Sequence, residues 1–184
     1  MINDETINVL AIDTGKNCGI VHYKGSPSIK LIKDDSRVTF YKLSLEVKKD
    51  RDIHRGGRYQ LFHNQLELLK DNIKDDLHAI IFEEITDHRS VHASNSYGGY
   101  YGMLAKFCTT NSIPLIGIGC TNVKLSFTGD GAATKSDMIT RARQFFPNYP
   151  FTHDEADALG ILFTFLNSKR FMSQSHLSDH SILS

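Results

Sequence analysis

The chain has 184 residues, and its 21 basic and 21 acidic side chains balance, so overall charge does not indicate a nucleic-acid partner. Its 40% of hydrophobic residues can form the core of one domain. It contains no apolar run of membrane-spanning length and no basic-then-apolar leader. We therefore expect a cytoplasmic protein with no membrane partner.

The cysteines are odd in number and scattered. Cys18, Cys108 and Cys120 form no CxxC pair, which favours reduced thiols over a disulfide framework or a zinc site. Basic residues gather between Lys42 and Arg58, a local excess that would suit DNA, although such runs are more often solvated faces.

The first quarter of the chain is typical of a sheet. Residues 1–6 are polar, and we expect them to be flexible. Ile7 to Ile12 form an apolar run that predicts a buried strand, and Asp13 ends it. Thr14-Gly15 and Gly19 predict a tight reversal, because glycine tolerates turn conformations. Further strands are expected over residues 20–23, 28–33 and 38–45, as an antiparallel meander.

Helices and strands then alternate. Apolar residues at helical spacing predict a core-facing helix over 58–74, and a short apolar run over 79–82 predicts a strand that ends at Glu83-Glu84. We expect a loop over 86–98, a helix over 99–111 and a strand over 113–118, followed by a short helix capped by Thr121 and a connector over 128–132. Thr134 or Ser136 is expected to cap the next helix, and the last helix runs to about 168.

Residues 169–184 are rich in serine and histidine, and we expect a disordered tail. The remaining order of elements predicts one α/β domain over 7–168. Its mixed sheet starts as an antiparallel meander, continues with parallel strands and is flanked by helices.

The last predicted helix carries acid on an otherwise apolar face. Asp154 and Asp157 share that face with Ile161 and Phe165. Buried carboxylates are costly unless they are paired or bound to metal, and oxygen ligands suit Mg²⁺ or Mn²⁺. Acids in a first helical turn can also simply complement the helix dipole, and the helix alone does not decide between these explanations. We expect His153 to cap this helix.

Two of the predicted buried strands also end in acid, at Asp13 and Glu83. Strand ends in the middle of such a sheet converge on one crevice. If the last helix crosses that edge, four carboxylates share a pocket that two divalent cations would hold together. Two metal ions roughly 3.5–4 Å apart form a clamp for in-line attack at phosphorus.

Four segments carry a more specific pattern. They are Leu10 to Gly15 with Gly19, residues 80–84, Asn122 to Lys124 with Gly129 to Lys135, and Asp154 to Leu159. In these segments, over about residues 7–168, the chain resembles the RuvC family of Holliday-junction resolvases in the ribonuclease-H-like superfamily. The first segment is shared with sugar kinases and actin-like ATPases, whereas Gly-x-Gly-x-Ala-x-Lys followed by Asp-x-x-Asp-Ala-Leu is much more specific.

The resemblance implies a five-stranded ribonuclease-H-like sheet and a metal-dependent endonuclease of DNA recombination and repair. It implies that a homodimer resolves four-way junctions by paired symmetric nicks, with two Mg²⁺ ions per site and Mn²⁺ able to substitute. The family's catalytic and metal-binding acids fall on Asp13, Glu83, Asp154 and Asp157. Its DNA-contacting lysines fall on Lys124, on a short helix, and Lys135, in the glycine-rich connector; without the resemblance, both would read as surface charge.

Some residues depart from the family pattern. Thr14 stands where many relatives have proline, and Glu84 stands beside Glu83, although strand alternation points the two side chains to opposite faces. The aromatic wedge that some relatives place after the second acid is missing from residues 85–87. Tyr97, Tyr100 and Tyr101 are the candidate substitutes. The divergence and compact size suit a bacteriophage or viral member, which would act in the host cytoplasm.

The same residues bear on several other functions. A debranching nuclease of broad specificity and a non-catalytic branched-DNA binding module are the main alternatives. The chain is too short for a two-domain ATPase or sugar kinase, and it lacks the phosphate-binding loop of a helicase. His88 and His92 have helical zinc spacing but no further ligand in pattern. The apolar helical face within 58–74 or 99–111 is the candidate dimer interface.

Overall fold

The computed structural model describes residues 6–27, 30–45, 56–85 and 90–168. Its five-stranded sheet has the order β3-β2-β1-β4-β5. The strands are β1 (Ile7–Asp13), β2 (Asn17–Gly25), β3 (Val38–Ser44), β4 (Ala79–Glu84) and β5 (Leu115–Gly119). β1, β2 and β3 pair antiparallel, whereas β4 pairs parallel with both β1 and β5. The predicted mixed sheet, a meander followed by parallel strands, is confirmed.

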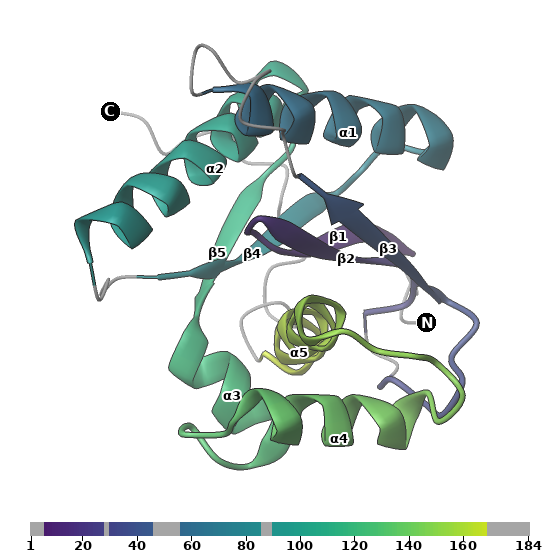
Figure 1. Ribbon diagram of the computed structural model, residues 1–184. Helices are drawn as coiled ribbons and strands as arrows, with labels where there is room; N and C mark the ends of the chain where they lie inside the picture. The colour runs from purple at the N-terminus through teal and green to yellow at the C-terminus, as the bar shows by residue number, and fades with distance from the viewer. Residues whose placement is uncertain (1–5, 28–29, 46–55, 86–89, 169–184) are drawn as a thin grey trace, which may run out of the picture.

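Helices cover both faces of this sheet (Figure 1). α1 (Gly57–Ile73) and α2 (Val91–Thr110) lie on one face, and α5 (His153–Asn167) lies on the other. α3 (Cys120–Thr128) and α4 (Lys135–Phe145) pack against α5 on its far side, so α5 runs between two layers. No helix in the described part of the chain is both long and apolar enough to cross a membrane.

β1 is buried on both faces, which explains its continuous apolar sequence. Val9 and Ala11 contribute to the core beneath α5, while Leu10 and Ile12 contribute to the core beneath α1 and α2. The alternation continues at the strand end, so the side chain of Asp13 points to the α5 face. The same alternation in β4 places Glu83 on the α5 face and Glu84 on the opposite one.

α5 is largely apolar because it is enclosed, and its acidic residues lie in its first two turns. Thr152 caps the start of the helix: its hydroxyl accepts from the Glu155 backbone, and the Glu155 carboxylate accepts from the Thr152 backbone N–H at 2.9 Å. Tyr149 also donates to Glu155, at 2.8 Å, although Glu155 is only 5% exposed. The expectation that His153 caps the helix was wrong, since His153 is its first residue.

The meander contains one strand fewer than expected. Residues 30–33 of the expected strand 28–33 are irregular, and residues 28–29 lie outside the described part. The loop is held instead by Asp35, which is 3% exposed and accepts from the Nε of Arg37 at 2.7 Å. Leu31 packs into the core beneath α5. A partly buried ion pair and one apolar anchor thus replace strand pairing here.

Three expected boundaries were also wrong. α2 begins at Val91, well inside the expected loop, because the Ser90 side chain caps it by accepting from the Ala93 backbone at 3.1 Å. α3 begins at Cys120 after Gly119, with no side-chain cap from Thr121. Gly19 lies within β2, and the reversal involves residues 14–16. The cap at Thr134 is confirmed, with Asp137 completing a capping box.

Candidate active site

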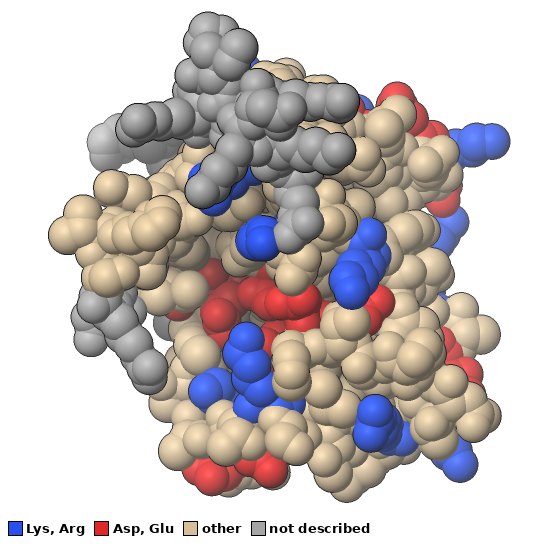
Figure 2. Space-filling view, in the orientation of Figure 1, with Lys and Arg blue, Asp and Glu red and all other residues tan. Residues whose placement is uncertain are grey.

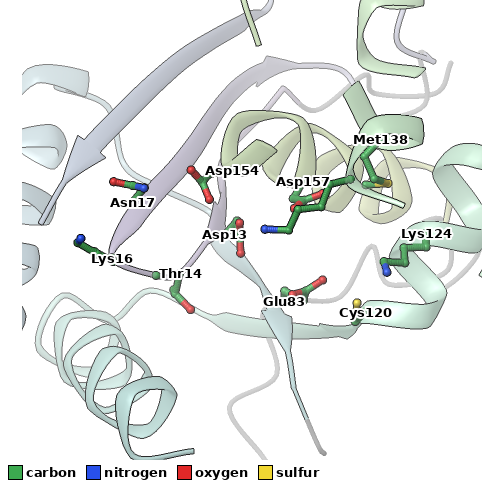
Figure 3. A pocket seen from close by; sticks show the side chains of 12 residues that line it. Asp13, Thr14, Lys16, Asn17, Glu83, Cys120, Lys124, Met138, Asp154 and Asp157 are labelled. Carbon is green, nitrogen blue, oxygen red and sulfur yellow. The ribbon is translucent and has the colours of Figure 1, made fainter. Parts of the chain in front are cut away.

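The four predicted acids line one cleft on the α5 side of the sheet. Asp13 is the last residue of β1, Glu83 lies near the end of β4, and Asp154 and Asp157 occupy the first turns of α5. The cleft has a volume of about 380 Å³. Figure 3 shows the side chains of these acids gathered around it.

Their convergence follows from register and helical periodicity. β1 and β4 are parallel neighbours in which Ile12 pairs with Phe82, so the next residues, Asp13 and Glu83, lie side by side on the same face. Asp154 and Asp157 are three residues apart and therefore share one side of α5. The sheet supplies two acids and the helix supplies the other two.

The acids repel one another, and burial intensifies the repulsion. Burial raises the pKa of Asp13 well above its usual value, and the charges of Asp157, Glu83 and Asp154 raise it further. Burial and then Glu83 raise the pKa of Asp157 to about 6. The Lys135 ammonium acts in the opposite direction on the pKa of both groups. The cleft is therefore short of positive charge.

Both predicted DNA-contacting lysines line this cleft. Lys124 lies on α3, as predicted, and Lys135 is the first residue of α4 rather than part of the preceding connector. Figure 2 shows acidic side chains on the floor of a hollow with basic side chains around it. Most of the predicted basic cluster, including Lys48 and Arg51, lies outside the described residues.

Sequence reasoning missed several residues of the cleft, namely Lys16, Asn17, Cys120 and Met138. The Cys120 thiol donates a hydrogen bond to the Glu83 carboxylate, and burial together with Glu83 raises the pKa of the thiol to about 11. A usable signal existed, because β5 runs parallel to β4 and its carboxyl end must reach the same edge of the sheet. Cys120 directly follows β5.

The neighbouring acid and the tyrosines occupy the other side of β4. The Glu84 side chain lies so close to Gly117 that a Cβ there would be 3.1 Å from it. Tyr97 accepts from the Ile85 backbone at 3.2 Å and stacks on Tyr101, with ring centroids 6.1 Å apart. Tyr100 is 2% exposed and Tyr101 is 43% exposed. Of the predicted substitutes for the wedge, Tyr100 is therefore enclosed in the core and Tyr101 is accessible.

The donor set suits a hard divalent cation. Carboxylate oxygens are the preferred ligands of Mg²⁺ and Mn²⁺, and buried carboxylates that repel one another are stabilised by such an ion. In the described part of the chain, no three Asp, Glu, His or Cys side chains are already arranged as a preformed metal-binding group. The fit therefore rests on the chemistry and burial of the acids.

Fold and cleft together define a ribonuclease-H-like domain with an acidic site at the edge of its sheet. No protein-family model matches the chain. It is similar to the crossover junction endodeoxyribonuclease RuvC of Anaeromyxobacter sp. (strain Fw109-5), with 33% identity over 79 residues, which cover 43% of this chain and 38% of that protein. RuvC of Anaeromyxobacter dehalogenans (strain 2CP-C) is 39% identical over 59 residues, or 32% of each chain. These matches span well under half the length of the curated relatives.

The fold is also that of a solved RuvC. A structure of Thermus thermophilus RuvC in complex with Holliday junction substrate matches with a TM-score of 0.66 and 18% identity, over 86% of this chain and 92% of that one. A second structure of the same RuvC matches with a TM-score of 0.62. The predicted resemblance to the RuvC family is confirmed in sequence and in fold.

Proposed function

We propose that the protein is a metal-dependent, structure-selective DNA endonuclease that resolves four-way junctions by paired symmetric nicks. The observation that carries the proposal is the convergence of Asp13, Glu83, Asp154 and Asp157 on one cleft that Lys124 and Lys135 also line. The curated relatives bear the name crossover junction endodeoxyribonuclease, and the Thermus thermophilus relative was solved with a Holliday junction.

We propose that the four acids hold two Mg²⁺ ions, with Mn²⁺ able to replace them. Bound in this way, such ions activate a water molecule and stabilise the leaving oxygen in phosphodiester hydrolysis. Asp13 is subject to the charges of all three other acids, so it is the carboxylate whose charge a bound cation would stabilise most. Lys124 and Lys135 would hold the phosphates of the bound strand, because ammonium groups beside the cleft neutralise backbone charge.

A homodimer is the assembly that fits a four-way junction, because two copies related by a two-fold axis can nick two equivalent strands. The apolar faces first considered as interfaces are occupied within the monomer. Phe62 and Leu66 of α1 and Leu104 and Phe107 of α2 are all core residues. The outer face of α2 is available instead.

That face is unusual for an exposed helix. Residues 91–105 contain no Asp, Glu, Lys or Arg. Gly98 and Gly102 are exposed and have open space where a side chain would lie, and Tyr101 is exposed beside them. We propose that two copies of this uncharged surface form the interface, since small residues permit two helices to approach closely. Sedimentation of the wild-type protein measures its oligomeric state.

Two alternatives remain. A debranching nuclease would use the same cleft on any branched DNA, and a binding module would use its lysines without cutting. The binding module explains the acids poorly, because carboxylates beside DNA repel phosphate unless a cation intervenes.

The substrate panel separates these functions. The wild-type protein is incubated with Mg²⁺ and a synthetic four-way junction, a fork, a linear duplex or an RNA–DNA hybrid. Paired cuts at symmetric positions in the junction alone identify a resolvase. Cuts in every branched substrate identify a debranching nuclease, and binding without cuts in Mg²⁺ or Mn²⁺ identifies a binding module.

A further inference from the structure

α5 begins directly above Gly19. A Cβ atom built on Gly19 would lie 2.0 Å from the carbonyl oxygen of Asp154, 2.2 Å from its carbonyl carbon and 2.6 Å from the backbone nitrogen of Glu155. By comparison, a Cβ atom built on Gly99 would lie 2.4 Å from the Tyr59 ring. The atoms crowded at Gly19 are backbone atoms, so they cannot rotate away as the end of a side chain can.

Gly19 also stands in line with the acids. In the antiparallel sheet it pairs with Asp13 on one side and with Lys42 on the other. Directly opposite residues point to the same face, with Cβ atoms about 4.5–5.5 Å apart. Asp13, Gly19 and Lys42 therefore follow one another across the same face of the sheet. The first turn of α5 occupies the space that a side chain at Gly19 would need.

The two flanking side chains act on that turn. Asp13 and Asp154 both line the cleft, and the charge of Asp154 contributes to the raised pKa of Asp13. On the other side, the charge of Lys42 acts to lower the pKa of Glu155. The first turn of α5 thus lies between Asp13 and Lys42, and it packs directly on the backbone of Gly19.

We propose that Gly19 is a positioning residue of the acidic cleft: its missing side chain sets the separation between Asp13 on the sheet and Asp154 and Asp157 on α5. It thereby determines how tightly the cleft holds a divalent cation. This inference rests on the proposed metal-dependent function. The requirement at Gly19 is for space alone, because its backbone is not in the left-handed region that favours glycine.

Replacement by alanine would push the start of α5 away from the sheet. Ordinary van der Waals contact begins at 3.4 Å, so the contact of 2.0 Å requires a shift of more than about 1 Å. Further along α5, Leu159 and Leu162 are fully buried and resist movement. The shift is therefore concentrated at the turn that carries Asp154 and Asp157. A misplacement of about 1 Å at a reaction centre can reduce the rate about 100-fold.

The test compares Gly19→Ala with two matched variants. Gly99→Ala creates a comparable clash, 2.4 Å from the Tyr59 ring, on the opposite face of the sheet. Gly119→Ala adds a methyl group near the cleft at an ordinary 3.8 Å contact. Binding of Mg²⁺ and Mn²⁺ is measured by calorimetry and by the metal-induced rise in melting temperature, and junction nicking is measured as a function of metal concentration.

We expect Gly19→Ala to bind metal at least about tenfold more weakly and to lose about 100-fold in nicking at limiting Mg²⁺, with partial recovery in excess Mn²⁺. Gly99→Ala should lower the melting temperature while the folded protein keeps wild-type metal affinity, and Gly119→Ala should match the wild type. Wild-type metal affinity in Gly19→Ala would overturn the proposal. So would equal losses in Gly19→Ala and Gly99→Ala.

Two further outcomes are decisive. If Gly19→Ala is unfolded even at low temperature in a stabilising osmolyte, the crowding is not absorbed at the start of α5 and the positioning role is rejected. If the wild-type protein neither binds metal nor cuts, the proposed function itself fails. Metal affinity tests Gly19 without DNA, so the two failures can be distinguished.

Discussion

Asp13 is half-buried, and burial together with the charges of three other acids raises its pKa well above the usual value. Asp157 shares this condition, with a pKa of about 6 against an ordinary value of 3.8. Folding therefore favours the protonated forms of both groups. Their contribution to stability is present below about pH 4 and is lost as the pH rises through the raised values.

The first prediction concerns pH and metal. In the metal-free protein, Asp157→Asn should raise the stability by roughly 1–3 kcal/mol near pH 7.5 and change it little near pH 4, because the amide removes a buried charge that exists only at the higher pH. Urea denaturation at the two pH values measures this. Mg²⁺ should stabilise the wild type far more at the higher pH. A destabilised Asp157→Asn at both pH values would show that repulsion is not the dominant effect.

A second prediction concerns Cys120, whose thiol donates to Glu83. Cys120→Ala should weaken Mg²⁺ affinity roughly fivefold, because Glu83 loses a donor worth about 1 kcal/mol. Cys120→Ser, which keeps a donor, should stay close to the wild type. Calorimetric titration of both variants decides the matter, and equal losses in the two would point to packing of the sulfur instead.

The positions of some single side chains could be predicted from the sequence, and those of others could not. The alternation of side chains along β4 was enough to predict that Glu83 and Glu84 point to opposite faces of the sheet. Nothing local distinguished Tyr100 from Tyr101, because their burial depends on where α1 packs. Cys120 and Lys16 carry no pattern of their own, and only the edge they share with β1 and β4 gives them a place in the cleft.

At the scale of elements, α5 depends on its first turn. Thr152→Ala removes the capping hydroxyl and leaves the buried Glu155 with fewer partners, so it should cost about 1–2 kcal/mol in the free energy of unfolding. Thr134→Ala removes the equivalent cap from the more exposed α4 and should cost about 0.5–1 kcal/mol. Urea midpoints of the two variants give the comparison. A smaller loss in Thr152→Ala than in Thr134→Ala would contradict this account of α5.

Helices and strands with a regular apolar spacing could be predicted from the sequence. Segments whose structure depends on local side-chain hydrogen bonds could not. α1 was anticipated to within a residue because its apolar spacing is regular. The beginning of α2 was missed because Ser90 caps a stretch rich in glycine and serine that resembles a loop. The strand expected over residues 28–33 failed for a similar reason, because the Asp35–Arg37 pair holds that segment in an irregular loop.

The need for glycine at position 19 comes from a tertiary contact, which could not be predicted from the sequence. Its position after Thr14-Gly15 suggested a turn, since glycine is common there. In the structure its lack of a side chain is needed by α5, which lies more than 130 residues further along the chain. A pattern read along the sequence does not contain that contact.

At the scale of the whole molecule, the cleft is lined by residues from the ends of β1 and β4 and from α3, α4 and α5. Figure 1 shows these three helices on the same side of the sheet. Lys124 comes from α3 and Lys135 from α4, whereas the four acids come from β1, β4 and α5. The predicted fold class and the order of acids along the chain were sufficient to locate this edge. The sequence left the position of Lys135 open, because Thr134 and Ser136 were both candidate caps of this helix, and Thr134 is the residue that caps it.

The lysines give a prediction about DNA binding. Lys124→Ala and Lys135→Ala should each weaken junction binding and each reduce the salt dependence of log affinity by about 1, because each would remove one phosphate contact. Lys74→Ala, at the end of α1 on the other side of the sheet, serves as a control. Fluorescence anisotropy over a range of salt concentrations provides the slopes. Unchanged slopes in both cleft variants would place the DNA elsewhere.

The central claim is that the acids of the cleft perform metal-dependent cutting, and Asp13→Asn tests it most directly. Wild type and variant are compared on the same four-way junction, with cutting measured in Mg²⁺ and binding measured in Ca²⁺. The account predicts that Asp13→Asn binds the junction but cuts at least about 1,000-fold more slowly, because the proposed metal site loses one of its carboxylates. Wild-type cutting by Asp13→Asn would contradict it.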